Sequence, residues 1–126
     1  MLSDHAPMPT LATADPGRSR DFYEGVLGFP PGEARADGVV YTCGGGSFFV
    51  YQSSFAGTNK ATALSFDLPE GFDDEVRRLR DAGVVFETFE APSIEWQDGV
   101  ATVGGGRAAW FSDPDGNIIN VQSGMA

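Results

Sequence analysis

The sequence predicts an α+β fold in which the element order β-α-β-β-β occurs twice. Two observations support this prediction. Each of two segments with helical spacing of apolar residues is preceded by a short β-rich run and followed by further β-rich runs. The two series are offset by roughly 53 to 55 residues, because Leu11 corresponds to Leu64 and Gly28 to Gly83. The repeat is one of element order, since residue identity between the halves is weak.

The first series begins with a short strand at residues 10–14. Asp15 followed by Pro16 predicts the start of a helix, because Asp accepts hydrogen bonds from the first helical N–H groups and Pro suits the first helical position. Apolar residues then recur at helical spacing until Gly28, a residue type that commonly ends helices. The β-rich runs "GVVYTC" and "SFFVYQ" flank Gly44–Gly46, which predicts a β-hairpin.

The second series begins with "ATALSFDL" at Ala61, where apolar residues alternate with small or polar ones as in a half-buried strand. Residues 71–83, "GFDDEVRRLRDAG", predict a helix, with acids in the first turn and arginines in the last as the helix dipole favours. We expect three strands to follow: "VVFETFE" at residues 84–90, then "AAWFS", then "NIINVQ". Residues 92–106 are expected to form a long loop.

A chain of 126 residues has the length of one domain, and 41% apolar residues provide enough material for one core. We therefore expect a single domain over residues 1–126. Within it, module one covers about residues 8–52, a linker covers 53–60, and module two covers about 61–123.

Composition also excludes some classes of binding partner. The net charge of −10 argues against nucleic acid, because phosphate binding needs clustered Lys and Arg. No run of about 18 apolar residues predicts a membrane span, and the N-terminal segment does not resemble a signal peptide. With one cysteine, Cys43, no internal disulfide is expected. These features favour a cytoplasmic protein that binds neither nucleic acid nor membrane.

Several catalytic arrangements are disfavoured by residue type. The single histidine, His5, lies in the N-terminal tail, so a serine nucleophile has no base near it and a two-histidine metal site has no second ligand. A carboxylate-only metal site using Asp67 and Glu95 is conceivable, but their spacing does not call for it. The Gly-rich runs are interpreted as hairpin turns, because neither lies between a strand and a helix start.

The aromatic residues are more informative. Trp110 lies in a predicted strand, while Trp96 lies in the predicted long loop among polar residues. An aromatic side chain held over a cleft by a loop is a common way to bind a flat apolar ligand. Tyr41 and Cys43 share one face of a predicted strand, where they are candidates for lining a cavity.

The segment "FSDPDGNIIN" predicts a turn followed by a strand. Asp113–Gly116 fits a type I turn, with Asp first, Pro second and Gly fourth. In the strand after it, Ile118 and Asn120 point to one face and the residues between them to the other. We expect Ile118 and Asn120 to face a ligand site together with Trp110.

Three motifs resemble the vicinal oxygen chelate superfamily, which includes glyoxalase I, extradiol dioxygenases, and fosfomycin and bleomycin resistance proteins. "ADPGRSRDFYEGVLGF" is similar to the superfamily's first strand-to-helix segment, "LRDAGVVF" to the end of its second helix, and "FSDPDGNIIN" to its terminal hairpin. "TNKAT", "GGGRAAWF" and "DPDGN" further resemble bacterial members described as glyoxalase-like. The resemblance implies a curved mixed sheet around a cavity, and a homodimer.

The resemblance also implies three metal-ligand positions, two normally His and one normally Glu. Here these positions hold Met8, Ala63 (within two residues) and Asn120. A thioether, a methyl group and an amide do not replace such ligands, so we expect no metal and no other cofactor. The resemblance places Trp110 at a position that lines the site in the resistance proteins.

These observations favour a metal-free protein that binds a small organic molecule and sequesters an antibiotic or toxic metabolite. The predicted ligand contacts are Trp110, Asn120, Trp96, Tyr41, Cys43 and Ile118. The alternative is a glyoxalase-like lyase or isomerase with non-standard metal ligands or none. A third hypothesis is an interaction module whose exposed strands pair with a partner domain.

Overall fold

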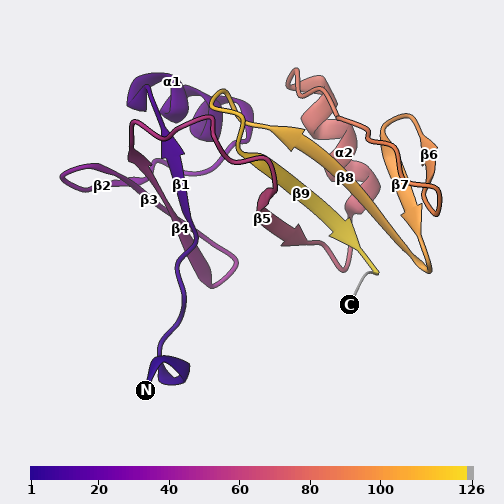
Figure 1. Ribbon diagram of the computed structural model, residues 1–126, viewed down its shortest axis with the longest axis horizontal. Helices are drawn as coiled ribbons and strands as arrows, with labels where there is room; N and C mark the ends of the chain where they lie inside the picture. Colours follow the sequence, from indigo (N-terminus) through magenta and orange to yellow (C-terminus); the bar gives the residue numbers. More distant parts are fainter. Residues whose placement is uncertain (125–126) are drawn as a thin grey trace.

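The computed structural model describes residues 1–124, which form two mixed β-sheets and few helices (Figure 1). The elements in chain order are η1 (Leu2–Asp4), β1 (Thr10–Thr13), α1 (Pro16–Arg20), η2 (Asp21–Val26), β2 (Glu33–Ala34), β3 (Gly38–Cys43), β4 (Gly46–Gln52), β5 (Thr62–Asp67), α2 (Phe72–Asp81), β6 (Glu95–Gln97), β7 (Val100–Val103), β8 (Gly106–Ser112) and β9 (Ile118–Ser123). The predicted α+β class is confirmed.

The first sheet has the strand order β1-β4-β3-β2. Strands β1 and β4 are parallel, whereas β3 is antiparallel to both of its neighbours. The predicted hairpin is present between β3 and β4, where Cys43 pairs with Gly46. Its turn residues Gly44 and Gly45 have φ values of 54° and 82°, a region that favours glycine. We call this sheet, with α1 and η2, the first half.

The second sheet has the strand order β5-β9-β8-β7-β6, with β5 parallel to β9 and the other pairs antiparallel. Together with α2 it forms the second half. Two expectations for this half were wrong. Residues 84–90 are not a strand but contribute one isolated bridge, between Glu87 and Trp110. The predicted loop at 92–106 contains the hairpin β6–β7. Strand β7 takes the edge of β8 at residues 106–108, and beyond it Glu87 forms a single bridge to the same edge, at Trp110.

The first helical segment starts as predicted. The Asp15 side chain accepts a hydrogen bond from Arg18 N, and Pro16 is the first helical residue. The helical backbone continues without a break to Val26, as predicted, but at Asp21 it passes from α1 into the π-helical turn η2. The wider turn places Tyr23, which is fully buried, against the first sheet.

Helix α2 is amphipathic and packs on the core side of the second sheet. Phe72, Val76 and Leu79 are its buried residues, and they belong to the same core cluster as Phe111 and Val121 of the sheet. No helix among residues 1–124 is long and apolar enough to cross a membrane.

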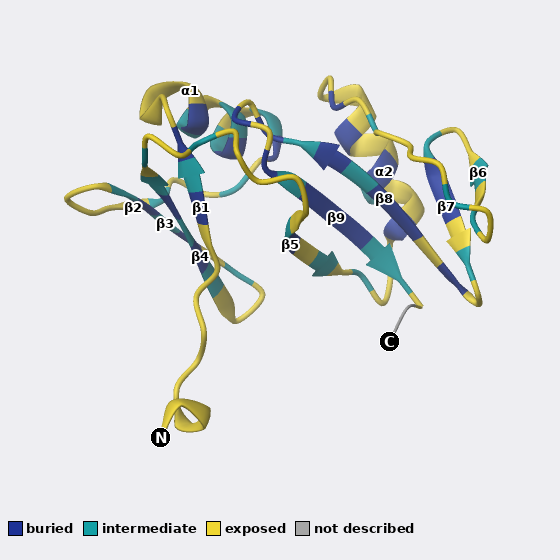
Figure 2. Cartoon of the chain, in the orientation of Figure 1, coloured by how far each residue is buried: buried dark blue, intermediate teal, exposed yellow. Residues whose placement is uncertain are grey.

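One hydrophobic core spans both halves, and the buried segments concentrate on the sheet centres and the inner helix faces (Figure 2). Aromatic rings of the two halves contact each other across the gap. Phe66 of β5 lies 5.9 Å from Phe29 and 6.4 Å from Phe48 between ring centroids, and Phe111 of β8 lies 6.5 Å from Phe22. The halves therefore pack as one body.

The turn between β8 and β9 adds a polar connection between the halves. The turn forms as predicted, with Gly116 N donating to Asp113 O at 3.0 Å. Four hydrogen bonds then reach the first half: Tyr23 Oη to Asp113 Oδ2 (2.7 Å), Ala14 N and Arg18 Nη2 to Asp115 Oδ1 (2.9 Å each), and Asn117 Nδ2 to Ala12 O (2.8 Å). We call Asp113, Asp115 and Asn117 the inter-sheet clamp. The sequence predicted this turn but not its contacts.

Candidate functional site

The strand register places the two tryptophans on one face of the second sheet. Trp110 of β8 lies opposite Asn120 of β9, and Trp96 of β6 lies opposite Ala101, which in turn lies opposite Ala108 of β8. Directly opposed residues share a face, and so do residues two apart in one strand. Trp96, Trp110 and Asn120 therefore project from the face turned away from α2.

A third aromatic residue, Phe89, joins the tryptophans. Its ring centroid lies 5.2 Å from that of Trp96 and 5.0 Å from that of Trp110, with near-perpendicular planes in both pairs. The two indoles are themselves 5.9 Å apart. Such edge-to-face packing is favourable and holds each ring in one orientation. We call Phe89, Trp96 and Trp110 the aromatic trio. Phe89 was not among the expected site residues, because the β propensity of residues 84–90 predicted a strand there.

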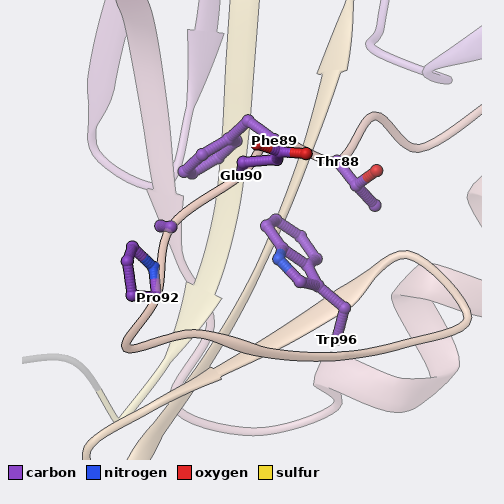
Figure 3. Close-up of a pocket in the computed structure, with 6 residues that line it drawn as sticks. Thr88, Phe89, Glu90, Pro92 and Trp96 are labelled. Carbon is purple, nitrogen blue, oxygen red and sulfur yellow. The ribbon is translucent and has the colours of Figure 1, made fainter.

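The outer side of the trio borders a shallow hollow of about 710 Å³ (Figure 3). The lining residues are Thr88, Phe89, Glu90, Ala91, Pro92 and Trp96. Figure 3 shows the Trp96 indole rising from β6 toward the segment that carries Phe89, with the Pro92 ring across the gap and the indole nitrogen on the side turned toward Pro92. Trp110 does not line the hollow, but its ring packs against those of both Phe89 and Trp96 and so supports their positions.

The hollow has an acidic border. Glu90 is among the six lining residues, none of which is basic. The ion pairs within residues 1–124 do not involve Glu90. An unpaired carboxylate at the hollow, in a protein with a net charge of −10, favours neutral or cationic molecules over anions.

Asn120 is held within the sheet. It is 3% exposed, and its Nδ2 lies 3.3 Å from Ala109 O and 3.3 Å from Val121 O. Its amide nitrogen therefore bonds to the strands, on the face that Trp110 shares. Ile118, the other predicted contact from β9, is half-buried two residues earlier on the same face.

Tyr41 and Cys43 lie elsewhere. Both are on the core side of the first sheet, so the structure does not bring them to the tryptophans. Tyr41 is 1% exposed, and its hydroxyl donates to Glu24 Oε2 at 2.9 Å. Burial raises the pKa of Tyr41, and the bond to Glu24 raises it further. Strand alternation predicted correctly that both residues share a face, but it carries no information on which faces of separate sheets meet.

The family's metal-ligand positions do not fit a metal in this chain. Met8 is 42% exposed before β1, Ala63 is half-buried against the core, and Asn120 is an amide bonded to the backbone. Among residues 1–124, no group of three or more His, Cys, Asp or Glu side chains is placed to hold a metal ion. The donor set is therefore wrong for a divalent cation at these positions.

Comparison with known proteins agrees with this architecture. The family model described as Glyoxalase/Bleomycin resistance protein/Dioxygenase superfamily matches residues 4–121. The chain belongs to this superfamily. The resemblance inferred from the three sequence motifs is thereby confirmed. A comparison with curated proteins gave no match.

Solved structures with the same fold include enzymes and resistance proteins. A glyoxalase/bleomycin resistance protein/dioxygenase from Alicyclobacillus acidocaldarius matches with TM-score 0.71 and 13% identity, covering 98% of this chain and 93% of that one. Fosfomycin resistance protein FosX from Mesorhizobium loti gives 0.67 and 16%, covering 97% and 93%. Lactoylglutathione lyase from Agrobacterium tumefaciens gives 0.67 and 17%, covering 94% and 93%. These identities establish a shared fold.

Proposed function

We propose that this superfamily member binds a flat small organic molecule at the aromatic trio without a metal ion, and thereby sequesters an antibiotic or toxic metabolite. The observation that carries the proposal is the mutual packing of Phe89, Trp96 and Trp110 beside an open hollow. Phe89 remains 49% exposed although it is a large apolar residue. Exposed aromatic surface held in a fixed orientation is typical of ligand sites.

The chemistry of the hollow indicates the kind of ligand. The Trp96 and Phe89 rings offer apolar faces for stacking, and the Trp96 indole nitrogen offers one N–H donor on the side of Pro92. Glu90 at the border supports a neutral or cationic ligand. We therefore propose a planar ring system with a hydrogen-bond acceptor at its edge and no negative charge.

The absence of the usual ligand residues supports binding over metal-dependent chemistry. Met8, Ala63 and Asn120 provide no charge to hold a divalent ion. We also propose that the protein acts as a homodimer in the cytoplasm. Phe55 and Val85 are 75% and 80% exposed, and a second copy would remove such apolar surface from water.

A thermal-shift screen tests the proposal. Metal-stripped wild-type protein is heated with a panel of antibiotics that includes bleomycin and fosfomycin, and with planar aromatic metabolites. A ligand at 100 times its dissociation constant adds about 2.7 kcal/mol of stability, so a planar, non-anionic compound should raise the Tm measurably. Trp96→Ala should reduce the rise to about half or less, because it removes the stacking face without touching the core. A rise that persists unchanged in Trp96→Ala would disprove binding at the trio.

Metal analysis separates the proposal from the rival enzyme. Protein purified without a His-tag is analysed by mass spectrometry of its elements. We expect no stoichiometric zinc, nickel, manganese or iron. One equivalent of any of these metals, together with lyase activity on a glutathione adduct, would favour the glyoxalase-like alternative.

A further inference from the structure

A second cavity, of about 280 Å³, lies on the opposite side of the second sheet from the aromatic trio, at the seam between the two halves. Its walls come from the end of the first helical segment, from β3, from β5 and the residue after it, from α2, and from the core faces of β8 and β9. The apolar lining includes Leu27, Phe29, Phe66, Leu68 and Leu79, together with Cys43. We call this cavity the seam pocket.

The walls of the seam pocket are almost entirely apolar, with three aromatic rings and several aliphatic side chains. Cys43 is its one thiol, and burial raises the pKa of that thiol. The thiol therefore stays neutral and poorly nucleophilic near neutral pH. A ligand in this pocket is held by apolar contacts and not by reaction with Cys43.

The polar rim consists of Arg78 and Glu75. The Arg78 guanidinium uses Nε and Nη2 to bond Glu75, and Nη2 also donates to Leu27 O at 2.9 Å. No hydrogen bond to another residue within 1–124 uses Arg78 Nη1. Gly28 leaves room beside this atom, because a Cβ at position 28 would lie 3.4 Å from it. Two N–H donors are therefore left at the rim, while Glu75 neutralises the charge.

We infer that the seam pocket is a second ligand site, which takes a compact uncharged molecule with an apolar body and one hydrogen-bond acceptor, such as an aromatic ketone. The apolar walls would bury the ring, and Arg78 Nη1 would donate to the carbonyl oxygen. The Glu75–Arg78 pair gives the rim no net charge, which disfavours ions of either sign. The inference does not depend on the function proposed for the aromatic trio, because the two sites share no residue.

Binding at the seam pocket has a consequence for the whole fold. Cys43 and Phe29 belong to the first half, and Leu79 and Phe66 to the second, so one ligand would contact both halves. A ligand that binds only the folded, closed arrangement stabilises it by mass action. A bound ligand would therefore hold the two halves together at the seam pocket, in addition to the inter-sheet clamp, which connects them elsewhere.

Alkylation of Cys43 tests the inference directly, because it is the chain's only cysteine. The rate of modification by N-ethylmaleimide is followed by mass spectrometry with increasing acetophenone. We expect saturable protection, reaching about tenfold slowing at ten times the dissociation constant. Ethylbenzene, which lacks the carbonyl acceptor, should protect only at higher concentration. Acetophenone should also shift the methyl NMR signals of Leu27, Leu68 and Leu79, and should do so equally in the wild-type protein and in Trp96→Ala.

Two variants assign the protection to the pocket. Leu68→Trp places a large ring in the wall of the pocket and should abolish protection by acetophenone, whereas Trp96→Ala should leave it intact. The inference is overturned if protection is not saturable up to the solubility limit, or if it is lost in Trp96→Ala. Methyl shifts confined to the sheet face of Trp110 would overturn it as well, whether or not Leu68→Trp folds.

Discussion

Tyr23 Oη lies 2.7 Å from Asp113 Oδ2, although 90 residues separate the two in sequence. Both residues are buried, at 0% and 5% exposure. Burial raises the pKa of Tyr23 far above its ordinary value, and the charge of Asp113 and the hydrogen bond to it raise it further. The phenol therefore remains a donor at every physiological pH. Its hydrogen bond connects η2 of the first half to Asp113 of the inter-sheet clamp in the second half.

Removing this hydroxyl should destabilise the protein without altering its shape. In Tyr23→Phe, Asp113 keeps its bonds from Asp115 N, Asn117 N and Asn117 Nδ2 but loses the phenol donor. A hydrogen bond to a charged partner is worth about 1.5 to 3 kcal/mol, so we expect the free energy of unfolding in urea to fall by about 2 kcal/mol. Tyr51→Phe is the matched control and should change it by less than about 0.5 kcal/mol. Equal effects of the two changes would refute the role assigned to the clamp.

The raised tyrosine pKa values predict loss of stability in alkali. Unfolded tyrosine ionises near pH 10, whereas Tyr23 and Tyr41 stay protonated in the fold. Above about pH 10 the unfolded state therefore releases protons that the folded state keeps, and the free energy of unfolding falls as the pH rises. Each of the two tyrosines contributes a fall of up to about 1.4 kcal/mol per pH unit. In a Cys43→Ser background, which removes the thiol that also titrates, Tyr23→Phe should make the decline shallower. An unchanged slope would contradict the assignment.

The lowered pKa of Glu24 predicts a loss of stability in acid. Partial burial raises its pKa, but hydrogen bonds from Tyr41 and Arg20 outweigh that effect, and the pKa is lowered overall. The stabilisation is therefore present above the pKa of the unfolded glutamate, about 4.3, and is lost as the pH falls through the lower folded value. Tyr41→Phe should weaken this acid dependence, as measured by urea unfolding at a series of pH values between about 3 and 6. If Tyr41→Phe steepens the dependence instead, the hydrogen bond is not its cause.

Trp96 and Trp110 should differ in their contributions to ligand affinity and to thermal stability. Trp96 lines the hollow, so Trp96→Ala should reduce ligand affinity with little change in Tm. Trp110 is half-buried and packs against Trp96 and Phe89, so Trp110→Ala should lower both the Tm and the affinity, because those two rings lose their support. Calorimetric titration of both variants with a compound from the thermal-shift screen checks this difference. Unchanged affinity in Trp110→Ala would show that the trio is not the site.

Restoring one family ligand should not create a metal site. In Asn120→Glu the glutamate is still accompanied by Met8 and Ala63, neither of which binds a divalent ion with useful strength. We expect no zinc binding in the micromolar range by calorimetry, compared with wild type under the same conditions. A stoichiometric zinc complex in this variant would mean that other side chains complete a metal site.

The sequence predicted the parts of the fold that depend on local chemistry. Asp15 and Pro16 start the first helix, Gly44 and Gly45 turn the first hairpin, and the clamp turn forms where Asp113 begins it. Each of these follows from the conformational preference of one or two residues, which neighbours in space do not override.

What the sequence did not predict depends on competition between distant segments. Residues 84–90 have β propensity, but β7 occupies the edge of β8 at residues 106–108, and only Glu87 forms a bridge to the rest of that edge, at Trp110. As a result Phe89 leaves the sheet and joins Trp96 and Trp110. Tyr41 faces the core for a similar reason, because η2 of the same half covers its side of the first sheet. The spacing of residues along the chain does not show which segment pairs with a given sheet edge, or which face of a sheet is covered by a helix.

Calorimetric titration of metal-stripped wild-type protein and Trp96→Ala, with the compound that gives the largest shift in the thermal screen, tests the central claim most directly. We predict one binding event per chain in the presence of EDTA. In Trp96→Ala we expect affinity to fall by about tenfold or more, equivalent to about 1.4 kcal/mol or more. Binding that requires an added metal, affinity that is the same in both proteins, or a screen in which no planar compound raises the Tm would contradict the claim.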